Sequence, residues 1–256
     1  MIGSGELSSV HAAYWKNTQS KFAIKKFNKT SREKEIINEI NLMNMVDFHP
    51  NIWNYESTFS YSLDETNYSL VLEYANGGTL REYLMENAAT IKWESQLKLA
   101  KEIASGILCL HDNEIIHRDL HHNNVLVHHH TIKIADFGRS CLQGSDYDTK
   151  AWVLFWQLTS CTSPFSFETR KDYISITLAI LNDAREIPVS NTNVKYNELY
   201  QKCWRQEPDE RPDIDQVISE LNNIDPKINF FNSQVNESTE ELKNEDGFSN
   251  CDLSNY

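Results

Sequence analysis

Three side chains in one short stretch of this sequence have the types and the order that phosphate chemistry needs. Asp119 is an isolated carboxylate, Asn124 places an amide five residues later, and Asp136 precedes an aromatic residue and a glycine. A carboxylate can accept a proton, and an amide with a second carboxylate can hold a divalent metal ion. The transfer of a phosphoryl group from a nucleotide requires this combination.

The start of the chain contains residues that can hold phosphate groups. Gly3 and Gly5 form a glycine-rich turn, where backbone amides approach phosphates closely, although an isolated pair of this kind is usually only a turn. A strand-like run at 22–25 follows and ends in Lys25. The alternative to a phosphate-binding role is that Lys25 is a solvated lysine at the end of a strand. A capping box at Thr30–Glu33 then predicts the start of a helix.

Glu39 lies on the apolar face of that helix. Ile36, Ile40 and Met43 recur at helical spacing, and Glu39 is three residues after the first and four before the last. A buried carboxylate destabilises a protein unless it is paired, so Glu39 at this position needs a cationic partner. The alternative is a glutamate at the rim of the helix, with Glu35 in the paired role.

The following segments are predicted to form the elements that hold these side chains. Between Trp53 and Tyr74 the pattern predicts two strands, the second of them buried, and 75–78 is a hinge-like break. A second capping box, Thr79–Glu82, starts a helix, and 93–111 is a long amphipathic helix. This helix leads directly into the stretch that carries Asp119.

Five histidines lie between His121 and His130, so a metal site has to be weighed against structural roles. Zinc ligands need a spacing that points them at one centre. His128–His130 fall instead where a hairpin between 125–127 and 132–134 should turn. The spacing therefore favours structural roles over a histidine metal site.

The order His-Arg-Asp-Leu-x-x-x-Asn at 117–124, followed by Asp-Phe-Gly at 136–138, resembles the catalytic core of protein kinases. The run Phe-Ala-Ile-Lys at 22–25 is similar to the segment that carries the phosphate-binding lysine of that family. Near the other end, Trp204 and Arg211-Pro212 resemble marks of the tyrosine-kinase-like and tyrosine kinase branches. The joint occurrence of these motifs makes the resemblance specific.

The resemblance implies a bilobal α+β fold with a β-rich small lobe, one helix beside it, and a larger, mainly helical lobe. A kinase domain would occupy residues 1–221, with the small lobe at 1–74, the hinge at 75–78 and the large lobe at 79–221. Residues 222–256 form a tail with seven acidic residues against two lysines, a net charge of −5. Low hydrophobicity with this charge predicts disorder, and a solvated tail without a function of its own is favoured.

The same resemblance implies that ATP and Mg²⁺ bind in the cleft between the lobes. Asp119 would accept the proton of the substrate hydroxyl, Lys25 would hold phosphates and pair with Glu39, and Asn124 and Asp136 would hold magnesium. Glu73 and Ala75 would bind adenine through their backbone, with Leu72 at the border of the pocket. The full set expected to contact ATP is Ile2, Gly3, Gly5, Val10, Ala23, Lys25, Glu73, Ala75 and Leu126.

The sequence departs from the family pattern after Gly138. A substrate-docking strip ending in Ala-Pro-Glu should precede the central helix of the large lobe, which is already in progress at 152–153. The buried aspartate that holds the catalytic loop in the family is also not clear, although Asp148 can stand in for it. We interpret the gap as an internal deletion near 152/153. It would leave Arg211 without its glutamate partner, which destabilises the region if Arg211 is buried.

Composition and charge narrow the class of protein further. A formal charge of −13 argues weakly against nucleic acid as the main partner. Five scattered cysteines without a Cys-x-x-Cys pair indicate neither a disulfide framework nor a cysteine zinc site, and favour a reducing compartment. The sequence has no start that resembles a signal peptide and no apolar run near the ~20 residues of a membrane helix. A soluble, cytoplasmic protein is expected.

The resemblance therefore predicts an ATP-dependent protein kinase that phosphorylates a protein substrate, on Ser/Thr rather than Tyr. His121 stands where Ser/Thr kinases usually carry lysine and many tyrosine kinases carry alanine, so it does not decide the hydroxyl. Ser145, Tyr147 and Thr149 are candidate phosphorylation sites that Arg118 can meet. The alternative is a nucleotide-binding pseudokinase or truncated product that acts as an interaction module. The sequence identifies neither the substrate nor the oligomeric state.

Overall fold

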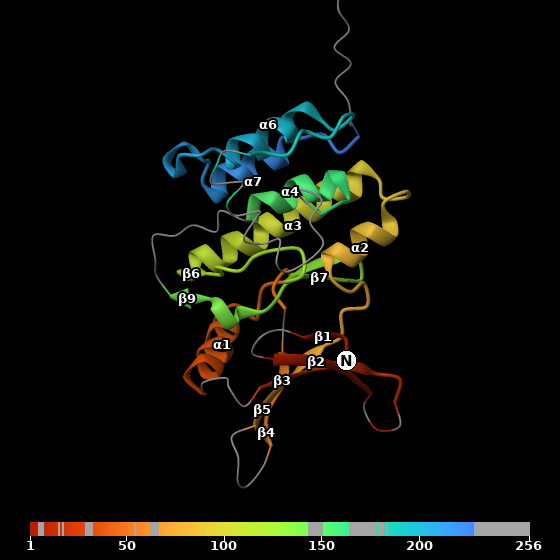
Figure 1. Cartoon of the computed structure of the whole chain (residues 1–256), viewed down its shortest axis with the longest axis vertical. Helices are drawn as coiled ribbons and strands as arrows, with labels where there is room; N and C mark the ends of the chain where they lie inside the picture. The colour runs from red at the N-terminus through yellow and green to blue at the C-terminus, as the bar shows by residue number, and fades with distance from the viewer. Residues whose placement is uncertain are drawn as a thin grey trace, which may run out of the picture.

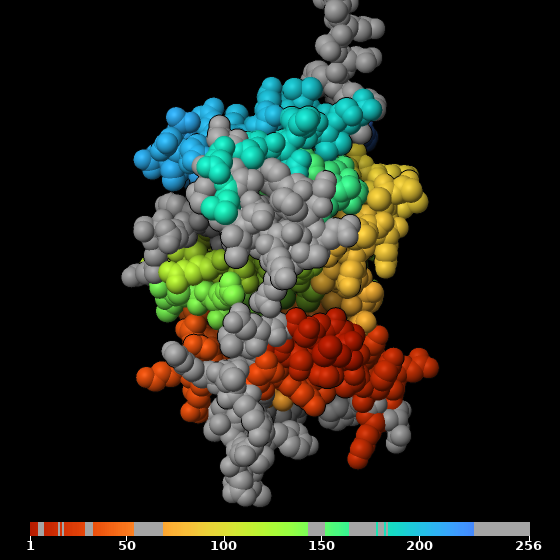
Figure 2. Space-filling model, in the orientation of Figure 1, coloured from red at the N-terminus to blue at the C-terminus, as the bar shows by residue number. Residues whose placement is uncertain are grey.

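The computed structural model describes residues 1–4, 8–14, 16, 18–28, 33–53, 55–61, 67–142, 151–163, 178, 182 and 184–227. These residues form two lobes, a sheet with one helix in the lower part of Figure 1 and a group of helices in the upper part. Figure 2 shows the red and orange atoms of the first lobe below the yellow, green and blue atoms of the second. The bilobal α+β architecture predicted from the sequence is confirmed.

The small lobe is built on an antiparallel five-stranded sheet in the order β1-β2-β3-β5-β4. Its strands are β1 (Gly3–Ser4), β2 (Ser8–Tyr14), β3 (Lys21–Phe27), β4 (Tyr55–Tyr61) and β5 (Asn67–Glu73). Because β3 lies in the middle, Lys25 has a neighbour on each side, Val10 of β2 and Leu70 of β5. This central position fixes the lysine backbone from both sides.

Helix α1 (Glu33–Val46) follows β3 and places its apolar face against the rest of the protein. Ile36 and Met43 are buried, Ile40 is partly buried, and Glu39 is buried among them at 3% exposure. The predicted helical periodicity is therefore present, including the carboxylate on the apolar face. The capping box predicted at Thr30 lies outside the described residues.

The large lobe consists of helices packed around α3, with two short two-stranded sheets that face the small lobe (Figure 1). Its helices are α2 (Leu80–Asn87), α3 (Trp93–Asp112), α4 (Ala151–Ser160), α6 (Val194–Cys203) and α7 (Ile214–Asn222). One of these sheets pairs β6 (Ile115–Ile116) with β9 (Cys141–Leu142), and the other is a hairpin of β7 (Val125–His128) and β8 (Thr131–Ile134). Its described residues also include the 3-10 turns η1 (Phe137–Arg139) and η3 (Pro208–Glu210).

The start of α2 shows how local sequence sets an element. Thr79 Oγ1 accepts a hydrogen bond from the Glu82 backbone at 3.2 Å, and Glu82 Oε2 accepts one from the Thr79 backbone at 2.9 Å. The predicted capping box is therefore formed, and it satisfies backbone N–H groups that the helix leaves without a partner.

The described residues extend past the start of the predicted tail at 222, as far as 227. Asn222 is the exposed last residue of α7, whereas Ile224 is only 3% exposed and packs in the core of the large lobe. The segment 228–256 and the candidate phosphorylation sites within 143–150 lie outside the described residues.

Arg211 does not meet the condition under which the sequence predicted destabilisation. Its side chain is half-buried rather than buried, its Nε donates to the Arg205 carbonyl at 2.8 Å, and an Nη donates to the Gln206 carbonyl at 2.9 Å. The destabilisation expected for a buried Arg211 therefore does not apply, since its guanidinium is partly exposed and hydrogen-bonded to carbonyl oxygens.

Candidate active site

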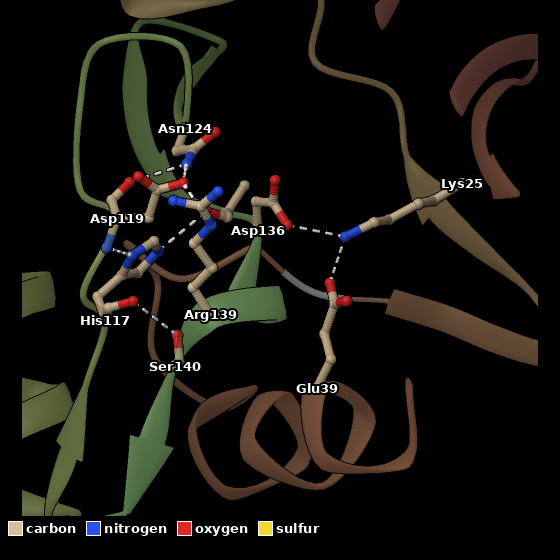
Figure 3. A network of polar contacts seen from close by, with 9 residues as sticks. Lys25, Glu39, His117, Asp119, Asn124, Asp136, Arg139 and Ser140 are labelled. Carbon is tan, nitrogen blue, oxygen red and sulfur yellow. Dashed lines mark hydrogen bonds and ion pairs between the residues drawn. The ribbon is translucent and has the colours of Figure 1, made fainter. Parts of the chain in front are cut away.

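Lys25 lies between two carboxylates at the centre of the site. Its Nζ is 2.5 Å from Glu39 Oε1 on α1 and 2.8 Å from Asp136 Oδ1 at the end of β8. Figure 3 shows the lysine reaching toward both carboxylates, which come from different lobes. The predicted Lys25–Glu39 ion pair is present, and Asp136 extends it across the two lobes.

The charges of this triad follow from burial and proximity. Burial alone would lower the pKa of Lys25, but Glu39 and Asp136 outweigh it, so the pKa of the ammonium is raised. Burial raises the pKa of Glu39, and Lys25 offsets part of this effect. For Asp136, burial opposes ionisation, yet Lys25 lowers the pKa below its ordinary value. The lysine is therefore a fixed cation that holds Asp136 as a carboxylate.

The backbone around Asp136 turns sharply to present this carboxylate. Asp136 has a φ of 67°, in the left-handed region that residues other than glycine avoid. A Cβ at Gly138 would lie 3.3 Å from Asp136 Oδ1 and 3.4 Å from Glu39 Oε2. Glycine at this position therefore keeps space beside both acids.

Asn124 and Asp136 present side-chain oxygens of the kind that could hold a magnesium ion. Asn124 Nδ2 donates to the Asp119 backbone carbonyl at 2.8 Å, which leaves the amide oxygen as the atom that can face a cation. The Asp136 side chain is 48% exposed, so its carboxylate is accessible. Carboxylate and amide oxygens are ligands that Mg²⁺ accepts, and Mg²⁺ usually needs only one or two protein ligands beside water and phosphate.

His117 supports the loop that carries Asp119. The Asp119 backbone N–H donates to His117 Nδ1 at 3.4 Å, so the ring proton is on Nε2, which donates to the Ala135 carbonyl at 3.0 Å. The ring lies 5.3 Å from the Phe137 ring, and Ser140 Oγ donates to the His117 carbonyl. His117 therefore has a structural role in holding this loop.

The Asp119 carboxylate lies between two nitrogen-bearing side chains. Its Oδ2 is 3.8 Å from Arg139 Nε (Figure 3). Its Oδ1 is 3.8 Å from His121 Nε2. The side chain is 25% exposed and therefore reachable by a substrate hydroxyl. Sequence reasoning missed Arg139, because its direction depends on the η1 turn after Gly138 and not on any motif spacing.

His122, the next residue in this loop, contacts helix α4. Its Nδ1 is 2.7 Å from Gln157 Nε2. Burial lowers the pKa of His122 to about 4 against the opposing hydrogen bond from Gln157, with smaller contributions from His121 and Arg81. The imidazole is therefore neutral at pH 7.

A sequence profile described as the protein kinase domain matches residues 1–154, which is more than half of the chain. The chain belongs to the protein kinase family. A serine/threonine-protein kinase/receptor of Acanthamoeba polyphaga mimivirus is 29% identical over 260 residues of alignment, covering 89% of this kinase chain and 15% of the relative.

Two other curated relatives carry different specificities in their names. The dual specificity protein kinase zakA of Dictyostelium discoideum is 30% identical over 230 residues, covering 73% of this chain and 29% of the relative. The serine/threonine/tyrosine-protein kinase HT1 of Arabidopsis thaliana is 28% identical over 222 residues, covering 75% of this chain and 55% of the relative. The kinase chain thus spans 15% to 55% of the length of these three relatives.

The residues expected to enclose ATP in this kinase domain come from both lobes. Ile2 donates its backbone N–H to the Val10 carbonyl at 2.8 Å, and Gly3 pairs with Val10 across β1 and β2. Ala23 of β3 pairs with Leu72 of β5. From the large lobe side, Leu126 on β7 is partly buried against the same core as Val10, as is Ala75 of the hinge. Gly5 lies outside the described residues.

The histidines of the β7–β8 turn contact the kinase hinge and α2. His128 Nδ1 accepts from the Asn76 backbone at 3.4 Å, so its Nε2 carries the proton and donates to Glu73 Oε1 at 3.1 Å. His129 is hydrogen-bonded to Asn76, and His130 to Tyr83 of α2. Within the described ranges, no group of three or more His, Cys, Asp or Glu side chains is arranged to hold a metal ion.

None of the described helices is long and apolar enough to cross a membrane.

Proposed function

We propose that this kinase domain binds ATP with Mg²⁺ and transfers the γ-phosphate to a protein hydroxyl, on Ser/Thr rather than Tyr. The observation that carries the proposal is the position of Lys25, which contacts Glu39 of the small lobe and Asp136 of the large lobe at once. Phosphoryl transfer depends mainly on positioning and charge stabilisation, and this triad aligns both lobes around one cation.

Each residue of the site has a proposed task in this reaction. Lys25 binds phosphate oxygens, Glu39 keeps the lysine in place, and Asp119 orients the substrate hydroxyl and accepts its proton. Asn124 and Asp136 hold Mg²⁺, which neutralises phosphate charge when it is bound. Ile2, Gly3, Gly5, Val10, Ala23, Glu73, Ala75 and Leu126 form the proposed nucleotide enclosure.

The preference for Ser/Thr rests on relatives and not on the site. The mimivirus relative is named a serine/threonine kinase, whereas the two others are named dual specificity and serine/threonine/tyrosine kinases. Placement in the tyrosine-kinase-like branch is proposed on Trp204 and Arg211-Pro212. Phosphoamino-acid analysis of a modified generic substrate would decide which hydroxyl is used.

We also propose that the segment before α4 is shortened relative to the family. The alignment with the mimivirus relative extends over 260 residues, more than the 256 residues of the whole chain, although it covers only 89% of the chain. Such an alignment must include positions where this chain has no residue. The match to the kinase profile also ends at 154, close to the proposed deletion near 152/153. The genomic or transcript sequence at this point tests the proposal, since an intervening coding segment would account for the gap.

The nucleotide site is tested by thermal unfolding with and without ATP and Mg²⁺. A ligand that binds only the folded state at 100 times its dissociation constant stabilises it by about 2.7 kcal/mol, so the melting temperature should rise by several degrees. No shift at saturating ATP and Mg²⁺ would refute the nucleotide site.

Catalysis is tested by phosphate transfer to a generic protein substrate, comparing the chain with the Asp119→Asn variant. The variant keeps the shape of the side chain but cannot accept a proton, and we expect transfer to fall by at least ~100-fold. Equal background rates in both proteins, with ATP binding intact, would instead indicate the nucleotide-binding module that was the alternative from the sequence.

A further inference from the structure

Gln157 is a polar side chain in an otherwise apolar segment of α4. Its neighbours in the helix from Trp152 to Leu158 are buried, and Gln157 itself is only 4% exposed. A buried amide without a hydrogen-bond partner destabilises the folded state, whereas an apolar side chain at this position would not. The partners of Gln157 therefore indicate what the amide does.

The amide group of Gln157 faces His122 of the catalytic loop. Its Nε2 lies 2.7 Å from His122 Nδ1 and 3.5 Å from the Thr162 carbonyl. A carbonyl can only accept, so the atom that faces both groups is the amide nitrogen, and His122 Nδ1 is the acceptor. The contact joins a neutral imidazole to the central helix of the large lobe.

His122 is also held through its backbone. Its carbonyl accepts from the Arg81 N–H of α2 at 3.4 Å. The residue thus connects the middle of the catalytic loop to α4 through its side chain and to α2 through its main chain. It lies three residues after Asp119 and two before Asn124, between the proposed base and the proposed metal ligand.

The loop has other described contacts, among them Leu120, which is fully buried in the core, and the Asn124 amide, which donates to the Asp119 carbonyl at 2.8 Å. His117 is fixed to Ala135 at the start, and the Asn124 carbonyl accepts from the Ala135 N–H at 2.8 Å at the end. Between them, Arg118 has a φ of 65°, a conformation that surrounding contacts must maintain. A side-chain contact in the middle of such a loop sets where both functional groups point.

We propose that the His122–Gln157 hydrogen bond is a positioning contact, which holds Asp119 and Asn124 in their working geometry by fixing the middle of the catalytic loop to α4. The inference rests on the proposed function, because it assigns the contact to the reaction of the same site. His122 and Gln157 are positioning residues, since neither touches a reacting group. A displacement of about 1 Å in a catalytic group is enough to lower a rate by about 100-fold.

Three variants separate positioning from simple stabilisation. Gln157→Leu removes the donor and keeps the helix apolar, and His122→Leu removes the acceptor. His122→Asn places an amide oxygen near the position of Nδ1 and should restore the contact. Tyr196→Phe is the matched control, because the Tyr196 hydroxyl donates to the Phe155 carbonyl of the same helix at 2.9 Å, away from the catalytic loop.

We expect kcat for phosphate transfer to fall by roughly tenfold or more in Gln157→Leu and His122→Leu, with KM for ATP changed by less than about threefold. His122→Asn should retain kcat within about threefold, and Tyr196→Phe should lower the melting temperature without lowering kcat. If the Leu variants keep the kcat of Tyr196→Phe at comparable stability, the positioning role is refuted.

A second measurement does not depend on phosphate transfer. Calorimetry of ATP binding with and without Mg²⁺ reports whether Asn124 is placed to support the metal. Gln157→Leu should reduce the gain in affinity from Mg²⁺ by about threefold or more and leave Mg²⁺-free binding unchanged. An unchanged Mg²⁺ effect would overturn the inference, whereas a wild-type chain that binds ATP and Mg²⁺ but transfers no phosphate would count against the proposed function alone.

Discussion

At the scale of residues, one lysine determines much of the charge balance of the candidate active site. Lys25 remains charged although it is buried, because Glu39 and Asp136 raise its pKa against the effect of burial. Removing one partner of a buried ion pair leaves an uncompensated charge. This destabilises a protein more than replacing both partners with apolar residues. Glu39 is the more informative position to change, since Asp136 also has the proposed metal role.

We expect Glu39→Gln to weaken binding of ATP with Mg²⁺ by about tenfold, equivalent to about 1.4 kcal/mol, because Lys25 would then be directed by Asp136 alone. Isothermal calorimetry measures this change directly. Glu35→Gln is the control, since Glu35 lies exposed on the same helix and removes the same charge. Equal losses in the two variants would show that net charge, and not the buried contact, sets the affinity.

Residues identified by local motifs were the ones that the sequence could locate. Asp119, Asn124 and Asp136 follow from spacing, and the buried position of Glu39 follows from helical periodicity. The contacts of His122 and Arg139 could not be anticipated, because they depend on how α4 and the η1 turn fold back onto the loop. The hydrogen bonds of Arg211 could not be anticipated either, since a sequence does not show which backbone carbonyls a side chain will reach.

At the scale of elements, the hinge at 75–78 and strand β7 are joined directly by backbone hydrogen bonds. Gly77 N–H donates to the Val127 carbonyl, and the Val127 N–H donates to the Gly78 carbonyl, both at 2.9 Å. The sequence predicted the hinge-like break and the β7–β8 turn separately. It could not show that the two meet, because no local pattern records which element a turn faces.

We expect Gly77→Ala to destabilise the fold by about 1–3 kcal/mol, because its Cβ would lie 2.8 Å from the Val127 carbonyl oxygen and the hinge would have to shift. Urea unfolding measures the change. Gly3→Ala is the matched control, since its Cβ would meet only the Val10 Cβ at an ordinary 3.8 Å. A Gly77→Ala protein as stable as the control would contradict the close approach.

At the scale of the whole molecule, hydrogen bonds also link the two lobes at a place away from the hinge. The Trp53 N–H donates to the Ile134 carbonyl, and the Ile134 N–H donates to the Asn51 carbonyl, both at 2.8 Å. Asn38 on α1 donates to the Ser140 carbonyl at 3.1 Å. The predicted hinge at 75–78 is where the chain passes from one lobe to the other. The lobes also share backbone hydrogen bonds outside this hinge, and only the folded structure reveals them.

The buried thiol of Cys203 on α6 provides a measure of whole-molecule unfolding. Cys203 is 1% exposed, and burial raises its pKa to about 12, with Glu220 adding to the effect. Because the thiolate is the reactive form, we expect alkylation of Cys203 at pH 8 to require unfolding and to slow when ATP and Mg²⁺ are added. Peptide mass spectrometry follows each thiol, with the half-buried Cys141 as the comparison. Fast alkylation of Cys203 under native conditions would contradict its place in the core.

The triad around Lys25 also has a consequence for the order in which ligands arrive. One ammonium beside two carboxylates leaves a local excess of one negative charge. A free triphosphate approaching this surface is repelled by the excess, whereas a divalent cation is attracted. The site therefore favours the binding of nucleotide that already carries its metal ion over nucleotide that arrives without one.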